Sequence, residues 1–105
     1  MSATRRLKSD KASPESQHDV AEVFKALADP SRLRILYDLA KADACVHELC
    51  ETLQMSQPAV SHHLRQLRAQ HLVTTRRTGR EIFYVLASSS ITDMLELARR
   101  HVEAS

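Results

Sequence analysis

The chain has 105 residues, of which 43% are hydrophobic and 27% charged, and it contains two cysteines and one glycine. This length and composition are those of a single small globular domain. No apolar run approaches the ~18 residues needed to cross a bilayer, and no secretion signal follows the first residues. We therefore expect a cytoplasmic protein. Two cysteines without a secretion signal argue against a disulfide framework and leave a metal or redox role open.

The net charge of +2 is small, but the charges are unevenly distributed. Residues 56–80 carry five arginines and no acidic residue. A basic window of this kind is typical of a surface that binds nucleic acid, although charge alone fits a solvated cationic face equally well. Residues 1–14 are polar and basic without apolar periodicity, so they are predicted to form a disordered tail before a folded domain over residues 15–105.

Apolar residues recur at helical spacing in four successive segments. We predict helices over residues 16–28, 30–41, 46–53 and 57–69. Asp29 ends the first helix, because a residue that precedes proline is disfavoured in the helical conformation. Gln54, Met55 and Ser56 form a short turn, and Ser56 is placed to cap the fourth helix.

Beyond residue 71 the apolar pattern changes to a period of about 2, which indicates β-strands. Residues 72–76 and 81–86 are the two β-like runs, and Gly79 lies between them, where a hairpin needs a residue with positive φ. A last helix is predicted to begin within residues 88–90. The order α-α-α-α-β-β-α, with a tight turn before the fourth helix, indicates a mainly α (α+β) winged helix-turn-helix.

In this fold the second helix of the helix-turn-helix enters the major groove of double-stranded DNA, and its N-terminal residues meet base edges. The fourth helix therefore supplies candidate base contacts and flanking phosphate contacts, while the hairpin arginines would reach phosphates or a minor groove. The position of Ser56 fits a helix cap that makes no DNA contact equally well. The predicted DNA-binding residues are Ser56, Gln57, Ser61, His62, Arg65, Arg68, Arg76, Arg77 and Arg80.

The first and last helices each carry an apolar stripe that a three-helix core with a wing does not need. Such surplus apolar surface predicts a homodimer with a two-fold interface. A two-fold dimer reads two half-sites about one helical turn apart, so the operator should be near-palindromic. The predicted interface residues are Val20, Val23, Phe24 and Leu27 from the first helix, and Ile91, Met94, Leu95, Ala98 and Val102 from the last.

Three segments resemble the ArsR/SmtB family of transcriptional repressors. FKALADPSRLRIL (residues 24–36) resembles the family's approach to the second helix, SQPAVSHHLRQLR (residues 56–68) its recognition helix, and LVTTRRTGREIFYVL (residues 72–86) its wing. The similarity extends over about residues 19–102. The resemblance implies a dimer that represses its own operon and leaves the DNA when an inducer, usually a metal or metalloid ion, binds.

The third helix carries the candidate sensing residues Cys45, His47 and Cys50. Arsenic-sensing members of the family have Cys-x-Cys-x-x-Cys here, so His47 takes the place of the middle cysteine. Two thiolates and one imidazole favour zinc or cadmium over arsenite. Because Cys45 and His47 do not share a helix face, either Cys45 lies in a non-helical entry turn or the first turn of the helix is distorted if all three residues bind one ion. Glu48 and His18 are candidate further ligands.

Two other interpretations of these residues stay open. The cysteines would also suit a thiol-based redox or sulfide sensor on the same scaffold, or they are simply small apolar side chains in a repressor without a small inducer. An enzyme is not expected. The sequence has no glycine-rich phosphate loop, no paired carboxylates in a plausible cleft and no Ser-His-Asp set.

Overall fold

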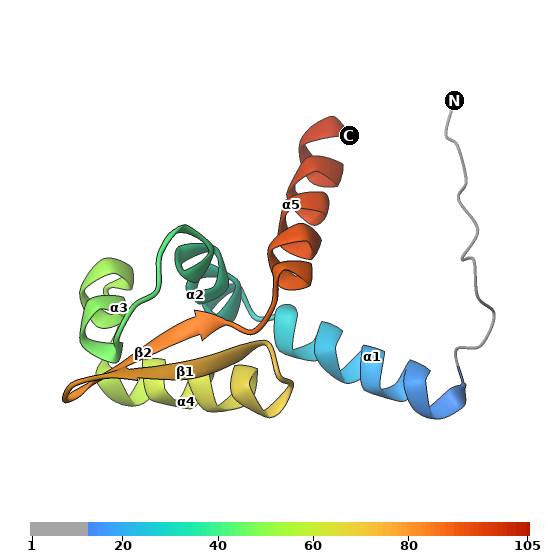
Figure 1. Ribbon diagram of the computed structural model, residues 1–105. Helices are drawn as coiled ribbons and strands as arrows, with labels where there is room; N and C mark the ends of the chain where they lie inside the picture. The colour runs from blue at the N-terminus through green and yellow to red at the C-terminus, as the bar shows by residue number, and fades with distance from the viewer. Residues whose placement is uncertain (1–12) are drawn as a thin grey trace.

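The computed structural model describes residues 13–105 (Figure 1). Its elements are α1 (Pro14–Leu27), α2 (Pro30–Lys41), α3 (Val46–Leu53), α4 (Gln57–Ala69), β1 (Val73–Thr78), β2 (Glu81–Leu86) and α5 (Ser89–Ala104). The predicted order and the winged helix-turn-helix fold are confirmed. Over the described range, no helix is both long enough and apolar enough to cross a membrane.

The bounds of α2, α3 and α4 are those predicted, whereas α1 begins earlier than expected. Ser13 is the N-cap of α1, its side chain accepting a hydrogen bond of 3.1 Å from the amide of Ser16. Pro14 follows at the first helical position, where its missing N–H costs nothing. Pro14 is therefore helical and was wrongly assigned to the tail, while residues 1–12 of the predicted tail lie outside the described range.

The core forms where α2, α3, α4 and the hairpin meet. Fully buried side chains from each element fill it, and the hydroxyl of Tyr37 donates to the carbonyl of Leu95 at 2.9 Å, which ties α5 to α2. In Figure 1, α1 and α5 project from this body as two arms. The largest fully buried side chains are those of Ile35, Leu36, Leu49, Val60, Leu64, Leu67 and Val73.

Asp29 lies at the corner between α1 and α2. Its Oδ1 accepts a hydrogen bond of 3.1 Å from the amide of Arg32, which caps α2, and the Nε of Arg32 donates to the carbonyl of Ala26 at 2.8 Å. The hydrogen bond from the Arg32 amide lowers the pKa of the Asp29 carboxyl. These bonds fix the corner that sets the direction of α1.

We expect Asp29→Ala to lower the free energy of unfolding by about 1 kcal/mol, the usual cost of losing an N-cap. Asp29→Asn, the matched control, keeps a capping oxygen and loses only the charge, so at neutral pH it should be destabilised less than Asp29→Ala. The pKa of Asp29 is lowered on folding, so its negative charge contributes to the free energy of unfolding at pH values above the unfolded pKa. It is lost as the pH falls below about 4, through the folded pKa. Urea unfolding at neutral and acid pH measures both effects, and an alanine variant as stable as wild type would contradict them.

The wing is an antiparallel hairpin in which Val73 pairs with Leu86 and Thr78 with Glu81. Its turn consists of Gly79 and Arg80, with Gly79 at φ +62°. The sequence predicted a longer connection over residues 77–80. Strand β1 continues to Thr78, because threonine and arginine extend the pairing with β2.

A third segment pairs with the wing. The amide of Ala44 donates to the carbonyl of Tyr84 at 3.2 Å, and the amide of Tyr84 donates to the carbonyl of Ala44 at 2.7 Å. The connection between α2 and α3 therefore lies along the outer edge of β2. The sequence predicted only a short connection here.

Candidate functional site

Helix α4 presents its polar face to solvent and its apolar face to the core. The Oγ of Ser56 accepts a hydrogen bond of 3.3 Å from the amide of Ala59 and so caps the helix. Gln57, His62 and Arg65 are exposed, and Ser61 is half-buried. The candidate base contacts thus lie on an accessible face of α4, as the apolar spacing predicted.

The turn before α4 is held by backbone bonds and by an arginine that the sequence analysis missed. Gln54 adopts the left-handed conformation at φ 55°, and the amide of Met55 donates to the carbonyl of Cys50 at 3.1 Å. The Nη2 of Arg34 donates to the carbonyl of Leu53 at 3.1 Å. Arg34 therefore joins α2 to the end of α3, where helix carbonyls lack partners.

The three wing arginines are not equivalent. Arg77 and Arg80 are exposed and, within residues 13–105, form no side-chain hydrogen bond or ion pair. Arg76 instead forms an ion pair of 3.0 Å from its Nη2 to Oδ2 of Asp43, and its guanidinium lies 5.1 Å from the centre of the Phe83 ring. Two of the three arginines are thus free to meet phosphates.

Cys45 lies at the N-cap of α3 in an extended conformation, outside the helix as its predicted role requires. Its amide donates to Oε1 of Glu48 at 3.0 Å. Hydrogen bonds from the amide and then from the thiol of Cys45 lower the pKa of the Glu48 carboxyl. The start of α3 therefore brings a thiol and a carboxylate into contact.

His47 and Cys50 form a second pair on the same helix. Together with Val46 and Gln57 they line a pocket of about 300 Å³. The Nε2 of His47 lies 3.5 Å from Oε1 of Glu51, and both cysteine thiols are free and partly buried. Gln57 is the first residue of α4, so this pocket adjoins the recognition helix.

The predicted ligands are not gathered into one site within a single subunit. Among the described side chains, no three from His, Cys, Asp and Glu are grouped to hold a metal ion. The extended N-cap places Cys45 with Glu48, whereas the helix places Cys50 with His47. Figure 1 also shows α1, which carries His18, at the opposite end of the molecule from α3.

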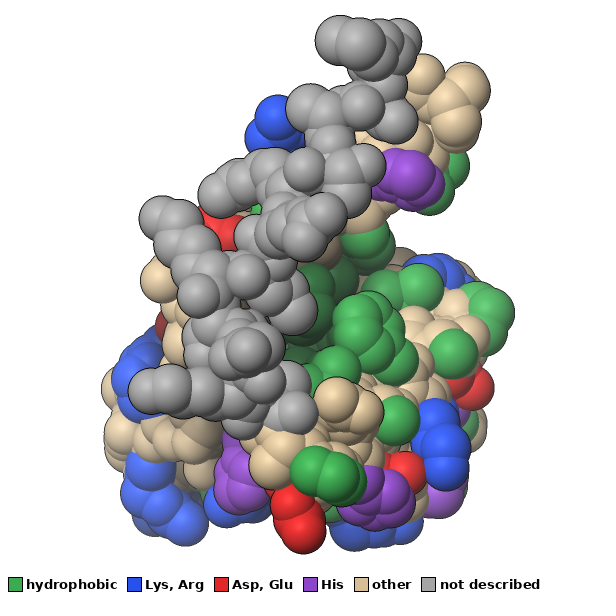
Figure 2. Space-filling model, turned by 90° about the vertical axis from the view of Figure 1, so that its right-hand side faces the viewer, with side chains coloured by type: hydrophobic (Ala, Val, Ile, Leu, Met, Phe, Trp, Pro, Cys, Tyr) green, Lys and Arg blue, Asp and Glu red, His purple; other side chains and the backbone are tan. Residues whose placement is uncertain are grey.

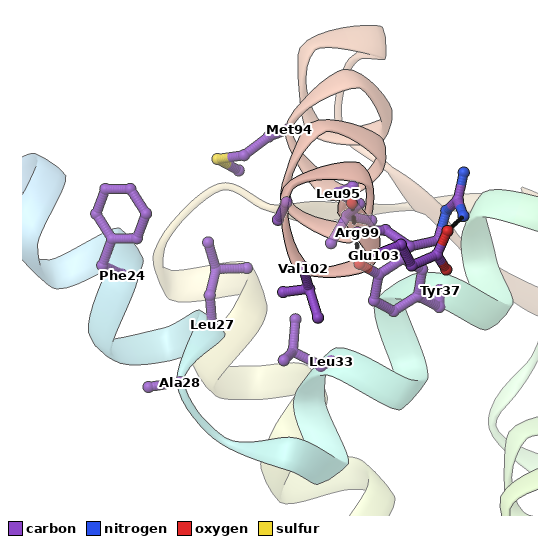
Figure 3. Close-up of a pocket in the computed structure, with 11 residues that line it drawn as sticks. Phe24, Leu27, Ala28, Leu33, Tyr37, Met94, Leu95, Arg99, Val102 and Glu103 are labelled. Carbon is purple, nitrogen blue, oxygen red and sulfur yellow. Dashed lines mark hydrogen bonds and ion pairs between the residues drawn. The ribbon is translucent and has the colours of Figure 1, made fainter. Parts of the chain in front are cut away.

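A large apolar groove of about 830 Å³ separates α1 from α5. Figure 2 shows hydrophobic side chains gathered in a hollow on this face. Figure 3 shows Phe24 of α1 and Val102 of α5 on opposite sides, with Leu27 between them. The main apolar side chains of the groove are Phe24, Leu27, Leu33, Met94, Leu95 and Val102.

Most of the predicted interface residues retain accessible surface in the single chain. Phe24 is 58% exposed and Val102 69%. Val20 and Ala98 are also exposed, and Val23 and Met94 are half-buried.

The other three predicted interface residues are buried within the single chain. Leu27 and Leu95 form part of the groove floor, and Ile91 packs into the core. Leu97 is 59% exposed and lies off the predicted apolar stripe of α5.

The comparisons with known proteins agree with this geometry. Residues 29–75 match the family described as bacterial regulatory protein, arsR family. The chain is 40% identical over 101 residues to a transcriptional repressor SmtB homolog of Synechocystis sp., covering 96% of this chain and 76% of that protein. It is 42% identical over 71 residues to an arsenical resistance operon repressor of Staphylococcus xylosus, covering 68% of each.

A solved structure shares the whole architecture. It is the homodimeric winged helix-turn-helix DNA-binding domain of a possible ArsR-family regulator from Mycobacterium bovis, with a TM-score of 0.82 and 28% identity, covering 94% of this chain and 91% of that one. The chain spans between 58% and 78% of the length of eight of the curated relatives that it matches. Its fold and its relatives show that the chain belongs to the ArsR/SmtB family of winged helix-turn-helix, DNA-binding transcriptional repressors, which are not enzymes.

Proposed function

We propose that the chain acts in the cytoplasm as a homodimeric repressor that binds near-palindromic operator DNA and releases it when zinc or cadmium binds at α3. The observation that carries the proposal is the shared pocket: His47 and Cys50 line it together with Gln57, the first residue of the recognition helix. An ion held there acts directly on the start of α4.

The dimer is supported by the groove between α1 and α5. Its lining is largely apolar and open, and the Mycobacterium bovis relative with the same fold is homodimeric. A second copy of the chain, related by a two-fold axis, covers the groove with its own α1 and α5. This arrangement presents two α4 helices and two wings to the DNA.

The DNA contacts come from α4 and from the free wing arginines. Gln57, Ser61, His62 and Arg65 face the bases, since glutamine pairs bidentately with adenine and arginine with guanine. Phosphate contacts come from the remaining basic and capping groups, which fix the register on the duplex. These phosphate contacts are Ser56, Arg68, Arg77 and Arg80.

The metal is held by ligands from α3. Cys45 and Cys50 supply soft thiolates and His47 an imidazole, a set that suits zinc or cadmium. Glu48 already contacts Cys45 and is the nearest further ligand. The partner subunit's His18 is the alternative, because α1, the helix that carries His18, lies at the opposite end of the same chain from α3 (Figure 1). The Staphylococcus relative is named an arsenical resistance operon repressor, which supports a metal or metalloid inducer.

Metal binding would draw the Cys45–Glu48 pair and the His47–Cys50 pair together. This movement would strain the start of both α3 and α4. Allosteric coupling of this kind is typically about 1–3 kcal/mol, or 5- to 150-fold in affinity. A shift of this size releases an operator that the metal-free dimer occupies.

Fluorescence anisotropy of the reduced protein on labelled DNA from upstream of its own gene tests the proposal, at fixed salt because binding is salt-dependent. Zinc or cadmium should weaken binding at least about ten-fold, and Cys45→Ser should abolish that effect. Thr52→Ala, a change at an exposed position of α3 that spares the proposed ligands, should keep it. Release by an oxidant instead of metal would favour the thiol-based sensor, and release by neither would leave a repressor without a small inducer.

A further inference from the structure

Arg76 lies across the wing and reaches a different part of the chain. It is on β1, opposite Phe83 of β2, and its guanidinium stacks on that ring. The Nη2 of Arg76 donates to Oδ2 of Asp43 at 3.0 Å, while its Nη1 donates to Oγ1 of Thr78 at 2.8 Å. One side chain therefore connects both strands of the wing to the segment that precedes α3.

The same segment is joined to the wing through its backbone. Ala44, which follows Asp43, is buried and exchanges two hydrogen bonds with Tyr84 of β2. The Asp43–Arg76 pair lies beside this bridge, so the wing is held at its outer edge by two backbone bonds and one ion pair. The flat guanidinium suits this position, because it stacks and donates at the same time.

We infer that Arg76 is a positioning residue for DNA binding, and that with Asp43 it forms a clamp that sets the angle of the wing. In the clamp the positive charge of Arg76 faces a carboxylate, while Arg77 and Arg80 are left free for phosphates. Asp43, an acidic residue, therefore favours binding to a polyanion. This expectation is opposite to the ordinary electrostatic effect of an acidic group near DNA.

The direction in which Asp43→Ala changes operator affinity distinguishes a clamp from a phosphate contact made by Arg76. Operator affinity is measured by anisotropy with no inducer present, so the result is independent of whether the chain senses metal. We expect Asp43→Ala to weaken binding about two- to five-fold, the scale of one exposed ion pair. Glu81→Ala is the matched control: it removes an exposed wing acid that does not contact Arg76 and should leave affinity equal or higher.

A double-mutant cycle completes the test. Arg76→Gln should weaken binding by itself, and Asp43→Ala added to Arg76→Gln should weaken it no further, because the two residues act through one contact. Thermal unfolding of each variant confirms that it is folded. Unchanged or tighter binding by Asp43→Ala, or losses that add in the double variant, would overturn the clamp.

Discussion

Replacing Phe24 by aspartate is expected to split the dimer and to weaken operator binding by about 100-fold or more, the range over which linked binding sites exceed single ones. Phe24 is 58% exposed in the single chain and stands at the groove between α1 and α5 (Figure 3). In the dimer the substitution buries an unpaired charge twice, once in each subunit. Sedimentation and anisotropy measure the two effects.

Thr92→Asp is the matched control for this substitution. Thr92 is exposed on α5 and does not line the groove, so its variant should remain dimeric and should bind as wild type does. The interface between α1 and α5 is excluded if Phe24→Asp remains a dimer at micromolar concentration.

Arg65→Ala is expected to weaken operator binding by about 5- to 150-fold and to relax the preference at one base pair of each half-site, as for an arginine that reads guanine. Arg65 is exposed on the outward face of α4, and within the described residues it makes no ion pair, so its donors are free. Anisotropy on the operator and on single-base variants measures affinity and preference.

Arg100→Ala removes the same charge from α5 and serves as the control for Arg65→Ala. It should lower affinity only slightly and equally for all sequences, because only a general electrostatic contribution is lost. Equal effects of the two alanine variants would show that Arg65 does not read a base.

Much of the fold could be predicted because local signals agree with the tertiary structure. The Asp29-Pro30 boundary, the Ser56 cap and the single glycine at the wing turn each have a short-range physical cause. The change from helical to alternating apolar spacing marked the hairpin for the same reason. These features depend on residues within a few positions of one another.

Long-range polar contacts could not be predicted in this way. The bond from Arg34 to Leu53, the Asp43–Arg76 pair and the pairing of Ala44 with Tyr84 join residues that lie far apart in the sequence. Nothing in the local pattern distinguishes Arg76 from Arg77, although one is paired and the other free. Gln54 was also missed, since a left-handed C-cap is usually glycine or asparagine.

The candidate sensing site was predicted only in part. Spacing placed Cys45 outside the helix, as the extended N-cap has it. Spacing did not show that Glu48 contacts Cys45, or that Gln57 joins His47 and Cys50 in one pocket. Side-chain arrangement around a helix start depends on the neighbouring helix, which the sequence pattern does not describe.

The most direct test of metal-controlled repression is the affinity for cadmium of the free dimer and of the operator-bound dimer, each measured by competition with a fluorescent chelator. Linkage requires that the operator weaken metal binding by the same factor by which metal weakens operator binding. We predict a factor of at least about ten in both directions, lost together in Cys45→Ser. Equal cadmium affinity of the free and operator-bound dimers would contradict the account, because a metal that binds both states equally cannot release the DNA.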